Sequence, residues 1–168
     1  TVSAALDWLA DHVNADGGWG DTLLSRSNLP TTLLAWSAFA ASGDPDRHVR
    51  TIGRARLYVQ AAAGGTEPLL IARAVAALYG ADRTFSVPIL TACALAGRLG
   101  GGREAFRHVP QLPMELGILP HSWLRRVGLP VVSYALPALI AMGLVRHRRR
   151  PKVSPGWLVR RAATPVAL

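Results

Sequence analysis

Apolar residues recur at helical spacing along most of the chain. In the segment Ala4–Val13, the side chains of Leu6, Leu9 and Val13 fall on one side of a helix, and two aspartates fall on another. The same pattern predicts four more helices, which begin or end at glycine, proline or aspartate: Pro30–Ala41, Arg47–Ala63, Glu67–Tyr79 and Val87–Leu99. The sequence therefore predicts an all-α fold built from short helices.

A weak internal repeat relates two pairs of these predicted helices, at an offset of 50 residues. Trp8-Leu9 in the first helix corresponds to Tyr58-Val59 in the third, and both helices run into a Gly-Gly turn. Helix pairs that repeat in this way stack around a shared core. Because two pairs are few for a stable stack, we expect the chain to be part of a larger ring of helices.

The pattern changes after Arg103, where prolines about ten residues apart leave room only for loops and short helical turns. An uncharged segment of 19 residues, Val127–Val145, follows. A helix of about 20 apolar residues can span a bilayer, but two prolines interrupt this segment and arginines flank both of its ends. We expect a helix that lies on one leaflet or dips into it. A buried core helix and a single membrane span are the alternatives.

Charge is strongly polarised along the chain of 168 residues, whose net charge is +9. Residues 1–46 carry a net charge of −5 and residues 47–168 a net charge of +14. The densest basic run, 146–152, attracts anions such as lipid headgroups, with a solvated tail as the alternative. Nucleic acid is the weakest candidate partner, because the run has no interleaved aromatic residues.

These features divide the chain into a helical domain over residues 1–145, with a membrane-facing region at about 121–145, and a basic linker or tail over 146–168. We expect apolar and basic side chains around this boundary to meet an anionic membrane surface. The residues are Trp123, Leu124, Leu129, Leu136, Leu139, Arg146, Arg148 and Arg149.

Residues with catalytic or ligand-binding chemistry are sparse. The single cysteine, Cys93, excludes an internal disulfide and reads as a small core residue. The five histidines are scattered without metal-ligand spacing. Asp16 and Asp21, on either side of Trp19, could bind a cation, but capping and turn roles fit their surroundings better. We expect no catalytic residue, no metal and no cofactor in this chain.

One motif links the first predicted helix to the turn that follows it. Trp8, Gly17 and Trp19 match the spacing of the QW repeat of the squalene-hopene cyclase and oxidosqualene cyclase family, which reads aromatic, aliphatic, three residues, Gln, three residues, Gly, any residue, Trp. Val13 stands at the position of the Gln, which in the family ties the helix end to the Trp. The segment therefore resembles a QW repeat whose Gln has been replaced.

The resemblance extends over about residues 4–150. A degenerate second copy places Tyr58 and Gln60 before a Gly-Gly turn, without the final Trp. Residues 83–91 and 129–137 are similar to the divergent bacterial branch of prenyltransferase and squalene-oxidase repeat proteins.

The resemblance implies one α/α toroid-like stack, an incomplete ring, from a protein whose other toroid is missing here. Family members dock on one membrane leaflet through an apolar plateau, which corresponds best to residues 121–145. They cyclise squalene or a similar polyprenoid after a D-x-D-D acid protonates an alkene, without a redox cofactor. That acid motif is absent from this chain. The chain would supply cavity wall, substrate entrance and membrane docking on the cytoplasmic face of a bacterial inner membrane.

A non-catalytic lipid-binding or scaffold protein with a decayed cyclase fold is the alternative. Besides the replaced Gln, the fourth predicted helix lacks an aromatic residue that the family places in its pocket, and Val75 stands near that position.

Overall fold

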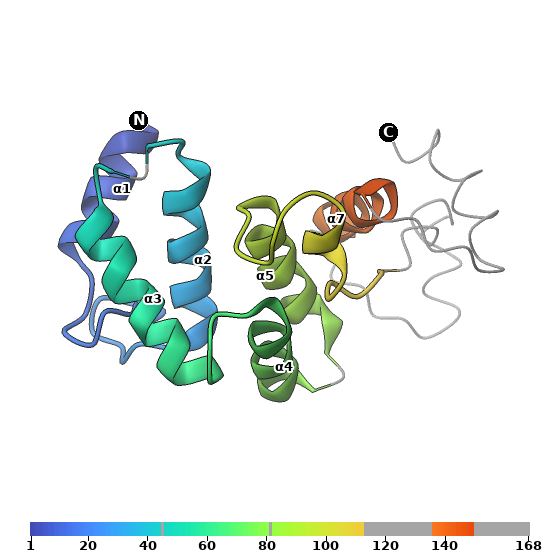
Figure 1. Ribbon diagram of the computed structural model, residues 1–168, viewed down its shortest axis with the longest axis horizontal. Helices are drawn as coiled ribbons and strands as arrows, with labels where there is room; N and C mark the ends of the chain where they lie inside the picture. The colour runs from blue at the N-terminus through green and yellow to red at the C-terminus, as the bar shows by residue number, and fades with distance from the viewer. Residues whose placement is uncertain (45, 81, 113–135, 150–168) are drawn as a thin grey trace, which may run out of the picture.

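A computed structural model describes residues 1–44, 46–80, 82–112 and 136–149, and every regular element in these ranges is helical (Figure 1). This confirms the predicted all-α class. The elements are α1 (Val2–Asp11), α2 (Leu29–Ala41), α3 (Val49–Ala63), α4 (Pro68–Tyr79), α5 (Arg83–Leu95), the 3₁₀ turn η1 (Glu104–Phe106) and α7 (Leu136–Arg149).

Polar side chains set the starts of two central helices. Asn28 caps α2, because its side chain accepts a hydrogen bond from the backbone N–H of Thr31 at 2.9 Å. Asp82 caps α5 by accepting from the N–H of Thr84 at 2.8 Å. This cap starts α5 about one turn before the predicted position, so that Pro88 lies inside the helix rather than in its first turn.

The end of α5 also differs from the prediction. Gly97 has a φ of +73°, in the left-handed region that glycine adopts without steric cost. The N–H of Arg98 then donates to the carbonyl of Cys93 at 2.8 Å, which closes the helix. The helix therefore ends at Leu95 and not at Leu99, before the triple glycine is reached.

Helices α2 and α5 connect the two halves of the core. In Figure 1, α1, α2 and α3 form one group, and α4, α5 and α7 form a second. Helix α2 packs against α1, α3 and α5, and α5 packs against α4 and α7. The side chains with the lowest exposure come from both groups and form one cluster; they include Leu33, Phe39, Val59, Ile71, Val75, Val87 and Phe106.

Helix α7 is the described part of the predicted membrane-facing helix, and it packs against α5. Leu139, Met142 and Val145 lie half-buried against the core, and Leu144 is buried. Leu139 therefore packs inward, as the core-helix alternative predicts for this stretch. Leu136 is the first residue of α7, whereas the predicted membrane-facing residues Trp123, Leu124 and Leu129 lie outside the described residues.

Arg146 corrects a second expectation for this region. Its side chain is 2% exposed, and its Nε donates to the carbonyl of Val109 at 2.8 Å. It therefore anchors α7 to the segment after η1 instead of facing a membrane. The domain boundary predicted after residue 145 falls inside α7, which continues to Arg149.

Within the described ranges, no helix is by itself both long and apolar enough to cross a bilayer. Only α3 and α4 taken together, bent by 64° relative to each other, reach that length and apolarity.

Candidate functional site at the aromatic turn

The segment from His12 to Asn28 joins α1 to α2, and we call it the aromatic turn because Trp19 lies at its centre. The Trp19 side chain is 5% exposed, and its indole N–H donates to the carbonyl of Leu9 at 2.9 Å. This carbonyl lies in the last turn of α1 and also accepts from the backbone N–H of His12 at 3.3 Å. The backbone N–H of Trp19 donates to Thr32 Oγ1 at 3.0 Å. Trp19 therefore ties the end of α1 to the start of α2.

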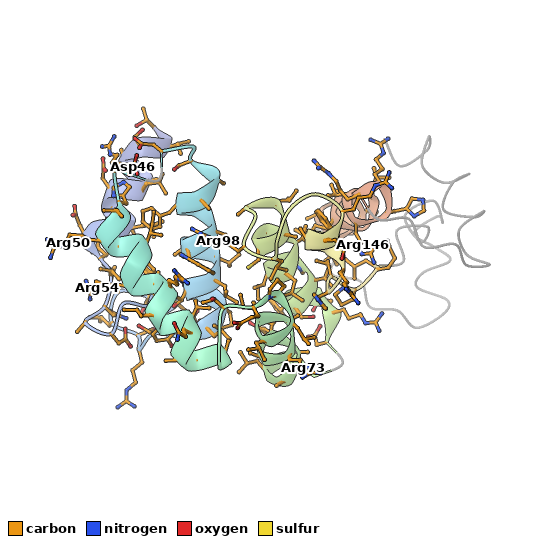
Figure 2. The ribbon with its side chains drawn as sticks, in the orientation of Figure 1. Asp46, Arg50, Arg54, Arg73, Arg98 and Arg146 are labelled. Carbon is orange, nitrogen blue, oxygen red and sulfur yellow. The ribbon has the colours of Figure 1, made fainter. Side chains whose placement is uncertain are left out.

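Gly17 brings the aromatic turn against the backbone of α3. Its φ is +89°, and a Cβ at this position would lie 2.7 Å from the carbonyl oxygen of Arg54. Arg54 in turn donates from Nη2 to the carbonyls of Asn14 and Ala15, at 2.7 and 3.0 Å. Figure 2 shows the Arg54 side chain on α3. Sequence reasoning did not identify Arg54 as part of this site, because only the tertiary contact reveals it.

Both aspartates of the aromatic turn accept hydrogen bonds. Asp16 has the predicted turn role, because it accepts from a backbone N–H, whereas Asp21 accepts from two side chains. One oxygen of Asp16 accepts from Ser27 Oγ at 2.6 Å and from the N–H of Gly18 at 3.0 Å. These hydrogen bonds, the one from Ser27 above all, hold the pKa of Asp16 below its ordinary value. Asp21 accepts from Thr31 Oγ1 at 2.7 Å and from Asn28 Nδ2 at 2.9 Å, and the same cause lowers its pKa.

These shifts predict that acid destabilises the fold. A carboxyl whose pKa is lower in the folded state stabilises it fully above the unfolded-state pKa, about 3.9 for aspartate. That contribution is lost as the pH falls from there through the folded-state pKa. We expect the free energy of unfolding, measured in urea, to fall below about pH 4. Asp16→Asn keeps a side-chain oxygen to accept from Ser27. In this variant the free energy of unfolding should decrease less as the pH is lowered. An unchanged acid profile for the variant would contradict the assignment.

Two pockets flank the Asp21 carboxylate. The first has a volume of about 400 Å³, and Trp8, His12, Trp19 and Asp21 are among the residues that line it. The second has a volume of about 740 Å³ and lies where the start of α2 meets α3 and α4. Its wall is mainly apolar, with Asp21 and Asn28 as polar members.

The first copy of the predicted repeat is assembled in this region, whereas the second is not. The Trp8 ring stacks on His12 with a centroid distance of 4.3 Å, and 48% of the residue is exposed. Tyr58 is half-buried, and burial together with the nearby charge of Asp16 raises its pKa. Gln60 is exposed, and α3 ends at Gly64 in the left-handed conformation rather than at a tryptophan. In the second copy, therefore, no tryptophan ties the helix end to the turn that follows it.

A cation packed on an aromatic ring links α2 to the loop after α5, and the sequence did not predict it. The guanidinium of Arg98 lies 4.0 Å from the centre of the Trp36 ring and donates to the Trp36 carbonyl at 2.9 Å. Burial lowers the pKa of Arg98. Cys93 is fully buried nearby, as predicted for a core residue, and burial raises the pKa of its thiol.

Of the three arginines predicted to contact a membrane, two are exposed in the described structure. Arg148 and Arg149 are exposed in the last turn of α7, where cations also interact favourably with the helix dipole. Among the described residues, no three His, Cys, Asp or Glu side chains are grouped in a way that could hold a metal ion.

The chain matches no family model, no curated protein and no solved structure. The resemblance to the cyclases therefore stays a prediction from the motif residues quoted above.

Proposed function

We propose that this chain is a segment of a triterpene cyclase similar to the squalene-hopene cyclases. The observation that carries the proposal is the hydrogen bond from the indole of Trp19, two residues after the left-handed Gly17, to the Leu9 carbonyl. The cyclase family ties a helix end to its motif tryptophan through a Gln. Here Val13 replaces that Gln and packs against the core, and the tryptophan makes the tie itself.

In this proposal α1 to α4 are two helix pairs of an α/α toroid, and they contribute wall and entrance to a cavity for a polyprenoid such as squalene. The acid that protonates the substrate belongs to the other toroid, since no D-x-D-D occurs here. Protonation of an alkene starts the cyclisation, and aromatic side chains stabilise the cations that follow. No redox cofactor takes part. The role of this chain is to hold the cavity wall in place.

The second part of the proposal is that the chain docks on the anionic cytoplasmic face of a bacterial inner membrane. Support comes from the exposed guanidinium groups of Arg148 and Arg149, which continue into a further basic stretch, Arg150 and Lys152. Each basic side chain near an anionic surface contributes about 1 kcal/mol to binding. The buried Arg146 does not take part.

We expect Arg148→Ala/Arg149→Ala to weaken binding to vesicles that contain anionic lipid by about 30-fold, since about 2 kcal/mol of attraction is removed. Vesicle flotation measures this. The matched control is Arg50→Ala/Arg56→Ala, which removes two exposed charges from α3. Equal losses for both double variants would contradict a role for the end of α7, and no flotation of the folded wild-type protein would contradict membrane docking altogether.

The cyclase part is tested on the full-length product of the gene. The protein is incubated with squalene in detergent, and the products are analysed by gas chromatography with mass spectrometry. A cyclic triterpene supports the proposal.

A non-catalytic lipid-binding or scaffold protein with a decayed cyclase fold is the second candidate. It is favoured by Val75, which stands near the position where the family places a pocket aromatic and which is fully buried in the core. Vesicle binding without any cyclic product from the full-length protein would support this candidate over the cyclase.

A further inference from the structure

The smaller pocket beside the aromatic turn combines a carboxylate with an aromatic wall. Trp8, His12 and Trp19 line it together with Asp21. Both hydrogen bonds to Asp21 come from neutral donors and reach the same oxygen, Oδ1. In the described part of the chain, the ion pairs involve Asp7 and Glu104 but not Asp21. The pocket therefore holds a negative charge that no described side chain neutralises.

The chemistry of this wall suits an organic cation with an apolar surface. The faces of indole rings attract cations, and quaternary ammonium groups are the ligands that aromatic pockets of this kind recognise. Such a group donates no hydrogen bonds, so a single carboxylate suffices as its counter-ion. Leu9 and Leu23 also line the pocket and offer apolar contacts to methyl groups. The net charge of −5 over residues 1–46 attracts cations to this end of the molecule.

We propose that this pocket binds a trimethylammonium cation, with Asp21 as counter-ion and the half-exposed ring of Trp8 as its aromatic wall. The inference does not depend on the cyclase proposal, since it uses neither a polyprenoid substrate nor the end of α7. Trimethylammonium groups occur both on small solutes and on phosphocholine lipid headgroups, and the experiment separates these two sources.

Isothermal titration calorimetry with choline on the full chain at neutral pH tests the proposal. We expect saturable binding of choline and no binding of its neutral isostere, in which carbon replaces nitrogen. Asp21→Asn keeps an oxygen to accept from Asn28 and Thr31, and should weaken choline binding about tenfold or more by removing the charge. Trp8→Leu should weaken it to a similar extent, and the half-exposed position of Trp8 leaves the core intact.

The matched control is Asp11→Asn, which removes one exposed negative charge from α1 at a residue that does not line the pocket. It should bind choline as the wild type does. Absence of saturable choline binding, equal binding of the neutral isostere, or equal losses for Asp11→Asn and Asp21→Asn would each overturn the proposal. Flotation on neutral phosphatidylcholine vesicles that free choline competes away assigns the site to a lipid headgroup. Choline binding without such flotation assigns it to a solute.

Discussion

Trp19→Ala will lower the free energy of unfolding by about 3–5 kcal/mol, the cost typical of truncating a buried aromatic side chain. The ring is 5% exposed and packs 6.0 Å from the ring of Phe39, centre to centre. Truncation therefore leaves a cavity between α1 and α2. It also removes the indole N–H that donates to the Leu9 carbonyl.

Chemical denaturation followed by far-UV circular dichroism measures this change. Trp19→Phe separates the two contributions, because it keeps most of the apolar surface and loses the donor. We expect it to cost about 1–2 kcal/mol, from the lost hydrogen bond and the smaller ring, while the Leu9 carbonyl keeps its hydrogen bond from the N–H of His12. Trp8→Ala is the matched control, since nearly half of Trp8 is exposed and its loss should cost well under half as much as the loss of Trp19. Similar losses in the free energy of unfolding for Trp8→Ala and Trp19→Ala would contradict the role of Trp19 in tying α1 to α2.

Gly17→Ala will destabilise the protein by about 2–4 kcal/mol, which combines the cost of a left-handed alanine with a steric clash. The new Cβ would lie 2.7 Å from the Arg54 carbonyl oxygen, and this atom belongs to the backbone of α3. Relief of the contact requires the aromatic turn and α3 to separate. That movement would also stretch the two hydrogen bonds from Arg54 to the turn.

Gly64→Ala provides the matched control for Gly17→Ala. Gly64 has a similar φ of +75°, but a Cβ there would meet no atom within 4 Å. Its replacement should cost only about 1 kcal/mol, from the left-handed backbone alone. The difference between the two variants in urea denaturation measures the close approach of the turn to α3. Equal costs would show that conformation alone makes glycine necessary at both positions.

The helices were predictable because their signals are local. Side-chain spacing of 3.6 residues and a cap such as Asn28 act within one or two turns, and the positions of α1 to α4 follow from them. The prediction for α5 was displaced by about one turn at each end. Proline and the triple glycine are strong stop signals, but the Asp82 cap and Gly97 lie closer to the helix and decide where it begins and ends.

The candidate site was predictable only in part. The motif spacing places Trp8, Gly17 and Trp19 at one helix end, and the structure brings them together there. Arg54 and Arg98 were not predicted, because their partners lie about 40 and 62 residues away along the chain. Neither helical periodicity nor a local motif indicates contacts between residues so far apart in the sequence.

The sequence by itself determined the helical class, most helix positions, the turn role of Asp16 and the uneven distribution of charge along the chain. Only the tertiary structure decided which apolar surfaces meet. Hydropathy could not decide whether the segment that becomes α7 contacts lipid or protein, because both environments favour the same apolar side chains. In its described part, α7 packs against α5 and Arg146 is buried. The physical reason is that burial depends on neighbours brought together by folding, whereas helix formation depends on neighbours in the chain.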